Sequence, residues 1–280
     1  MTSPTPFAGT PTFRATTRDA TLALARRDLL RFVRQPARLA GTLGQPLLFW
    51  LVLGAGLSPS FDAGTFAGGG MTYTEYFYPG MLAMMVLFAS VFSTITLIED
   101  RDQGFLQGVM AAPVSRLSIV MGKVLGGTMV AMIQASILLL AIPFMGFHIG
   151  PGSVVMIVVT LAVLSVACTG FGFLVAWSME STAGFHGVMM LVMMPLWFLS
   201  SALFPLESAP AILKGVMYVN PFTWAMILLR APFYGGPLEC FADTRYLTAL
   251  GITAGVVLLI LWGGVRRVKR REKGLPLARG

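Results

Sequence analysis

The side chains that could do chemistry in this sequence are few and far apart. His148 and His186 are the only histidines, and Cys168 and Cys240 are the only cysteines. A catalytic nucleophile needs a base within hydrogen-bond reach, and a metal site needs several ligands gathered together. The two cysteines fall in an apolar stretch and in a polar loop, so they offer neither a disulfide nor a metal site. We expect no catalytic residue, no metal and no cofactor on this chain.

Nucleotide binding is also not expected here. No segment has the Gly-x4-Gly-Lys-[Ser/Thr] pattern of a phosphate-binding loop. Gly122-Lys123 lacks the preceding glycine loop and lies at the start of an apolar stretch. If ATP drives this protein, ATP and its magnesium ion bind to a different chain.

The composition is that of a membrane protein. Hydrophobic residues make up 56% of the chain and charged residues 11%, with a mean hydropathy of +0.77. A membrane-spanning helix needs about 20 apolar residues. Six stretches meet this length and predict an all-α integral membrane protein: residues 39–57, 79–98, 124–144, 153–177, 185–205 and 246–265.

Basic residues gather at both ends of the chain. Seven precede the first predicted span, seven follow the last, and three lie between the second and third spans. The outer loops hold only the remaining three: Lys214, Arg230 and Arg245. The positive-inside rule then puts both termini in the cytoplasm. We expect a multi-pass protein of a plasma membrane of bacterial or archaeal type. The net charge of +8 therefore suits an anionic membrane surface rather than nucleic acid.

The segment before the first span, residues 1–38, contains a second kind of helix. Apolar residues of the stretch 22–38, among them Ala25 and Phe32, fall on one side of a helical projection. Arg27, Arg31 and two further arginines fall on the other. This pattern predicts an amphipathic helix in the membrane interface with its arginines towards lipid phosphates. The alternative is a soluble helix that packs on a partner.

A short cytoplasmic helix is predicted directly after the second span. Within residues 99–116, four apolar residues recur at helical spacing, and Pro113 ends or kinks the helix. They are Phe105, Leu106, Val109 and Met110. Such a stripe outside the membrane is expected to be buried against a partner protein; the alternative is a simple capped loop.

The residues of this segment resemble a known family. An acidic start, Gly104, Leu106, the run Pro113-Val114-Ser115-Arg116 and a following Gly-Lys resemble the permease subunits of type-2 ATP-binding cassette exporters. A second resemblance follows the fifth span, where residues 198–206 precede Asn220-Pro221 and a later arginine. The order and spacing are most similar to drug-resistance permeases of the daunorubicin type. Gln107 departs from the acidic residue that is common at its position.

The resemblance implies a fold and a set of partners. It implies six transmembrane helices, the interface helix, a cytoplasmic coupling helix, and an external re-entrant hairpin before the last span. A basic tail, residues 266–280, follows that span. Two permease copies, expected as a homodimer, would pair with two ATPase subunits. The residues implied for coupling to the ATPase are Glu99, Gly104, Phe105, Leu106, Val109, Met110, Pro113 and Arg116. Those implied for the hairpin are Pro205, Asn220, Pro221 and Arg230.

Polar and small residues inside the spans are open to two interpretations. Gln45 and Gln134 could form helix–helix hydrogen bonds or line the export path. The glycine pairs Gly122/Gly126 and Gly251/Gly255 could each permit a close helix approach.

These observations predict an export permease for an amphipathic or lipid-like cargo, such as a drug, glycolipid or polysaccharide. A secondary transporter or channel is the main alternative, but no carboxylate lies within a predicted span to carry protons. A membrane enzyme would need a catalytic pair that the sequence does not suggest. Fold alone does not choose the cargo.

Overall fold

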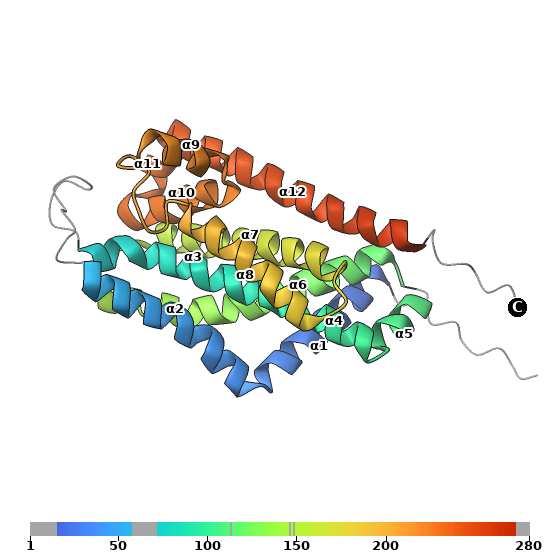
Figure 1. Ribbon diagram of the computed structural model, residues 1–280. Helices are drawn as coiled ribbons and strands as arrows, with labels where there is room; N and C mark the ends of the chain where they lie inside the picture. The colour runs from blue at the N-terminus through green and yellow to red at the C-terminus, as the bar shows by residue number, and fades with distance from the viewer. Residues whose placement is uncertain (1–15, 58–71, 113, 146, 148, 273–280) are drawn as a thin grey trace, which may run out of the picture.

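The computed structural model describes residues 16–57, 72–112, 114–145, 147 and 149–272. This part of the chain is helical and contains no strand (Figure 1). Residues 1–15 of the predicted N-terminal segment and residues 273–280 of the predicted basic tail lie outside the described residues. Pro113, which was expected to end or kink the short helix, also lies outside them. The elements are α1 (Thr17–Val33), α2 (Pro36–Leu57), α3 (Tyr73–Ser93), α4 (Ile95–Asp102), α5 (Phe105–Ala111), α6 (Arg116–Leu139), the 3-10 helix η3 (Ile142–Met145), α7 (Pro151–Ala176), α8 (Thr182–Phe198), α9 (Ala211–Val219), α10 (Pro221–Tyr234), α11 (Pro237–Ala242) and α12 (Thr244–Glu272).

Four helical segments of the described chain are long and apolar enough to cross a membrane. They are Tyr73–Asp102, which joins α3 and α4, together with Arg116–Leu139, Pro151–Ala176 and Thr244–Val268. A fifth would be added if α9 and α10, bent by 88° to each other, formed one span.

The first and fifth predicted spans correspond to shorter apolar helices, Ala40–Gly56 and Thr182–Phe198. The fifth was expected to continue to residue 205, but α8 ends at Phe198. There the Ser200 hydroxyl donates to the carbonyl of Trp197, which satisfies a carbonyl near the helix end.

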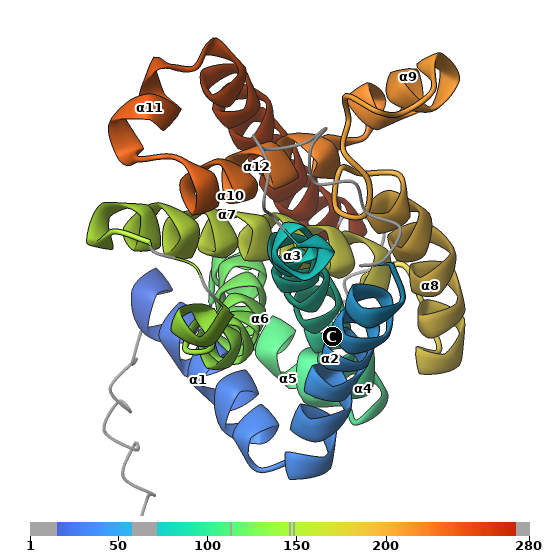
Figure 2. The same cartoon turned by 90° about the vertical axis from the view of Figure 1, so that its left-hand side faces the viewer.

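Helix α3 lies at the centre of the bundle and contacts α2, α6, α7, α8 and α10 (Figure 2). Its sequence is apolar on all sides, and nearly every residue from Tyr76 to Val91 is buried. Thr72 and Glu75 form a capping box at its start. Helix α12 lies at the edge, where apolar residues such as Leu258 and Leu259 are exposed. An apolar surface of this kind suits contact with lipid rather than water.

The two ends of the bundle differ in character. One end, which we call the basic end, carries α1, α4, α5 and the C-terminal part of α12 (Figure 1). The opposite end carries α9, α10 and α11.

The two glycine pairs have different surroundings. A Cβ atom at Gly122 would lie 2.8 Å from the Cβ of Leu24, and one at Gly126 would lie 3.1 Å from the Cβ of Asp28. This first pair therefore lets α1 lie directly against α6. A Cβ atom at Gly251 or Gly255 would meet nothing within 4 Å, so the second pair supports no contact within the described chain.

Candidate functional site

The predicted coupling segment forms two short helices joined by a glycine. Helix α4 ends at Asp102, and Gly104 has a φ of 76°, the only positive φ among the described residues. A side chain at that position would strain the backbone, so glycine is required where the chain turns into α5. The short helix predicted from the apolar stripe is confirmed as α5.

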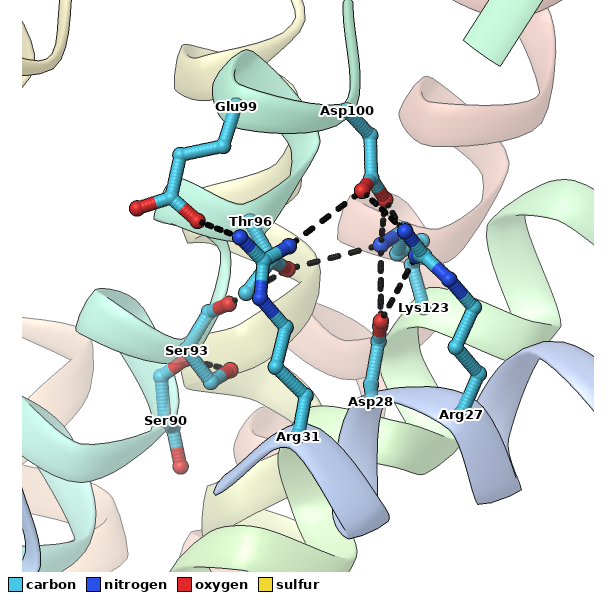
Figure 3. A network of polar contacts seen from close by, with 9 residues as sticks. All are labelled: Arg27, Asp28, Arg31, Ser90, Ser93, Thr96, Glu99, Asp100 and Lys123. Atoms are coloured by element: carbon cyan, nitrogen blue, oxygen red, sulfur yellow. Dashed lines mark hydrogen bonds and ion pairs between the residues drawn. The ribbon is translucent and has the colours of Figure 1, made fainter. Parts of the chain in front are cut away.

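A cluster of charged side chains anchors this segment to the bundle (Figure 3). Its centre is Asp100 on α4, which is fully buried. The Asp100 carboxylate accepts hydrogen bonds from Nη1 and Nη2 of Arg27 at 2.9 and 2.7 Å, and from Nζ of Lys123 at 2.6 Å. Arg31 donates to it as well, at 3.3 Å. Helices α1, α4 and α6 are thereby joined at one carboxylate.

Two further acids complete the cluster. Asp28 on α1 lies 2.9 Å from the Lys123 ammonium, and Glu99 lies 2.7 Å from Arg31. Burial raises the pKa of Asp28 while the charge of Lys123 opposes that rise. The hydrogen bond to Asp100 raises the pKa of Arg27. We call these six residues the charge cluster: Arg27, Asp28, Arg31, Glu99, Asp100 and Lys123. Three cations face three anions, which is what makes such deep burial tolerable.

The prediction for the arginines of α1 is wrong for two of them. Arg27 and Arg31 were expected to face lipid phosphates, but they point into the bundle and bind Asp100 (Figure 3). Of its apolar residues, Ala25 and Phe32 are buried against the bundle, whereas Leu22 and Val33 are exposed. A helical projection separates apolar from charged residues, but it does not reveal carboxylates elsewhere in the fold that attract the charged side.

The apolar stripe of α5 is turned mainly towards its own chain. Leu106 is only 3% exposed within the core, and Val109 and Met110 pack against that core. The ring of Phe105 lies under the guanidinium of Arg27, 3.7 Å from its centre. Leu106 is therefore covered by its own chain, whereas Phe105, Val109 and Met110 are half-buried, and their contact with a partner stays a prediction.

The outward side of α5 has a different composition. Gln107, Gly108, Ala111 and Ala112 are exposed, and a Cβ atom at Gly108 would meet nothing within 4 Å. We call these four residues the outer face of α5. Three of its four residues are glycine or alanine, so most of its side chains are small.

Two arginines hold the ends of the coupling segment. Arg101 donates to the carbonyls of Met179 and Trp177, just beyond α7, at 2.7 and 3.0 Å. Arg116 donates to the carbonyl of Met110 in the last turn of α5 at 3.3 Å, where a cation also suits the helix dipole. Together with the charge cluster, these bonds hold α4 and α5 in fixed positions on the bundle.

The residues predicted for the hairpin lie together at the opposite end. Asn220 stands at the bend between α9 and α10, where its Nδ2 donates to the carbonyls of Leu196 and Leu199 at 2.7 and 2.9 Å. Its Oδ1 accepts from the amide of Phe222 and caps α10, with Pro221 in the first turn. Asn220 thus ties the bend to the end of α8.

Arg230 ties the same region to the central helix. Its Nη1 donates to the Tyr76 hydroxyl at 2.7 Å, and its guanidinium lies 4.1 Å from the centre of that ring. Its Nη2 lies 3.4 Å from the carbonyl of Ala202, in the segment between α8 and α9. Pro205 is buried in that segment.

Gln45 and Gln134 have different environments. Gln45 is half-buried on α2, whereas Gln134 on α6 is 0% exposed. Neither side-chain atom of Gln134 has a hydrogen-bond partner among the described residues. Gln134 borders a cavity of about 20 Å³ together with Thr42, Ser93 and Thr96. That volume holds one water molecule, which would satisfy the amide.

Sequence reasoning did not assign a role to Asp28, Asp100 or Lys123. One available signal was Asp28, the only acid in the arginine-rich stretch 22–38. Another was the Lys of the Gly122-Lys123 pair, about two turns inside an apolar helix. Charges in such places need partners.

These features define the class of the molecule as a helical membrane protein with several candidate spans, in which α4 and α5 are anchored to the bundle. Sequence comparison agrees: the profile of the ABC-2 type transporter family matches residues 19–234. The transport permease ycf38 of Cyanophora paradoxa is 30% identical over 243 residues, covering 85% of this chain and 82% of that protein. The daunorubicin resistance ABC transporter permease protein DrrB1 of Streptomyces coeruleorubidus is 25% identical, over 81% of this chain and 80% of that protein. YbhR of Escherichia coli, described as a multidrug ABC transporter permease, is 29% identical over 54% of this chain and 41% of that protein.

The chain belongs to the ABC-2 type transporter family. It is a membrane-embedded transport subunit of the ABC permease type, and membership of this family implies an ABC ATPase as its partner.

Proposed function

We propose that this permease exports an amphipathic or lipid-like cargo, powered by a separate ATPase that contacts the outer face of α5. The cargo class is a drug, as the names of two relatives suggest for those proteins, or a glycolipid or polysaccharide. ATP and magnesium would bind to the ATPase alone.

The observation that carries this proposal is the contrast between the two sides of α5. Its inner side is held by Leu106 in the core and by the contact of Phe105 with Arg27. Its outer face is exposed. A short helix fixed to three bundle helices moves with them as one body, so a push on its outer face is transmitted to the membrane helices.

The proposed topology has six spans, with both termini in the cytoplasm and α9 and α10 as a hairpin that dips in from the outside. The 88° bend and the capping of α10 by Asn220 suit a hairpin better than a straight crossing. Irregular backbone at such a bend must be buried in protein, and Asn220 is buried.

A homodimer is proposed for the assembly. Gln45, half-buried on α2, could line a path between two copies. Gln134 is enclosed within the protomer and would reach such a path only after a rearrangement of α1 or α2. The alternative function is a secondary transporter or channel that works without ATP.

The decisive experiment is Gly108→Arg on the outer face of α5, in a permease coexpressed with its ATPase. Arginine suits a helix and has open space there, so insertion and thermal stability should be unchanged. We expect copurification of the ATPase to fall about tenfold or more, because a central interface residue commonly supplies over about 2 kcal/mol. Transport should be lost.

Gly236→Arg at the opposite end, also in open space, is the matched control and should leave both measurements unchanged. Phe105→Asp is less informative, because it breaks the contact with Arg27 inside the chain. If Gly108→Arg retains its ATPase and transports normally, α5 is not the contact. Transport that persists without any ATPase would favour the secondary transporter.

A further inference from the structure

An open groove of about 770 Å³ lies between α7 and α12 near the basic end. Leu174 in the last turn of α7, together with Trp177 and Ser178 just beyond that helix, forms one side, and the C-terminal part of α12 forms the other. The α12 residues that line it are Trp262, Gly263, Arg266 and Arg267. The charge cluster lies elsewhere and contributes nothing to this groove.

The cations of the groove differ from the others at the same end. Arg27, Arg31 and Lys123 bind carboxylates, and Arg101 and Arg116 bind backbone carbonyls. Arg266 and Arg267 are exposed, and neither forms an ion pair within the described residues. Two adjacent unpaired guanidiniums bind phosphate oxygens well, since each offers several donors in one plane.

The same helix provides a matching apolar surface. Leu258 and Leu259 lie four and three residues before Trp262, and Arg266 lies four residues after it, so these residues share one side of α12. Leu258 and Leu259 are each 67% exposed, and Trp262 is 58% exposed with the guanidinium of Arg266 4.4 Å from its ring centre. Along about 10 Å of helix, the surface changes from aliphatic to aromatic to cationic. This order matches acyl chain, interface and phosphate in one membrane leaflet.

We propose that this groove binds one anionic phospholipid, of which phosphatidylglycerol is the test case. Its phosphate lies between Arg266 and Arg267, and its chains run along Leu258 and Leu259. A basic pocket between membrane helices is a favourable site for such a headgroup. A zwitterionic lipid also carries a phosphate, but its choline would bring a positive charge towards the two guanidiniums.

The test uses quenching of tryptophan fluorescence in the purified, detergent-solubilised permease. Brominated phosphatidylglycerol and brominated phosphatidylcholine are titrated separately, since bromine quenches only indoles that the chains touch. Phosphatidylglycerol should quench at a concentration about tenfold lower than phosphatidylcholine does, which corresponds to about 1.4 kcal/mol. Trp262→Phe should remove most of this lipid-selective quenching. Glycerol 3-phosphate should compete poorly, because it lacks the chains.

The variant Arg266→Gln/Arg267→Gln should lose the preference for phosphatidylglycerol. Arg26→Gln/Arg34→Gln is the matched control, because it removes two exposed arginines of α1 at the same end and should keep the preference. Native mass spectrometry of the same proteins counts bound phosphatidylglycerol independently. Equal quenching by the two lipids, or an unchanged preference in Arg266→Gln/Arg267→Gln, would overturn the proposal. Competition by glycerol 3-phosphate as strong as that by the lipid would do so too. Because no ATPase is present, the result is independent of the proposed contact at α5.

Discussion

Arg27 and Asp100 form a two-pronged ion pair across 73 positions of sequence, with N–O distances of 2.9 and 2.7 Å. The same guanidinium covers the ring of Phe105. One side chain of α1 therefore holds both the end of α4 and the start of α5. The N-terminal helix α1 therefore helps to hold the coupling segment, α4 and α5, in position on the bundle.

The first prediction concerns this arginine. Arg27→Ala should lower the free energy of unfolding by about 2 kcal/mol, because charged hydrogen bonds to a buried carboxylate are lost. Arg26→Ala, one residue earlier but exposed, should change it by no more than about 0.5 kcal/mol. Chemical unfolding in mixed micelles measures both. Equal effects of the two substitutions would show that the pair with Asp100 contributes little.

Lys123 offers a more severe test. Its ammonium donates hydrogen bonds to Asp28 and Asp100, and the residue is only 5% exposed. Lys123→Met therefore removes a cation that two buried carboxylates share. We expect a loss of about 3–5 kcal/mol in the free energy of unfolding. Adding Asp28→Asn restores the charge balance and should recover more than half of that loss. A double variant as unstable as Lys123→Met alone would mean that packing, not charge, explains the effect.

The two glycine pairs should respond to alanine with opposite signs. Gly122→Ala brings a methyl group to 2.8 Å from Leu24 and should destabilise the permease, since overpacking costs about 1–3 kcal/mol. Gly251→Ala adds a methyl group in open space and should stabilise α12 by up to about 1 kcal/mol. Thermal unfolding midpoints of the purified variants report both. A destabilising Gly251→Ala would reveal a contact of α12 with another chain.

Topology can be tested at three open positions. Gly215→Cys, Gly236→Cys and Gly108→Cys, each in a background without Cys168 and Cys240, add a thiol where the structure has space. An impermeant thiol reagent applied to intact cells should label the first two, and Gly108→Cys only after lysis. Gly215 precedes α10 and Gly236 follows it. Opposite labelling of these two positions would make α9 and α10 a span instead of a hairpin.

The sequence was sufficient to predict a bundle of apolar helices, because long apolar stretches between charged ends leave few alternatives, but it did not predict that α8 ends at Phe198. It was also sufficient for the short helix after α4 and for the bend at Asn220, where local residue types determine the geometry. It did not determine which way Arg27 and Arg31 point, since their partner Asp100 is distant in sequence. Nor did it show that Leu106, on the apolar stripe of α5, packs in the core of its own chain. Periodicity identifies a face that is buried, but not what covers it.

The charge cluster also bears on the order in which the protein assembles during synthesis. Asp28 is made early, but Lys123 follows it 95 residues later, after two apolar segments have entered the membrane. Until α6 emerges from the ribosome, Asp28 lacks its lysine and α1 lacks the glycine surface against which it lies. Arg27 of helix α1 can pair with Asp100 as soon as α4 has been made, but the docking of α1 is complete only when α6 supplies Lys123 and the glycine surface.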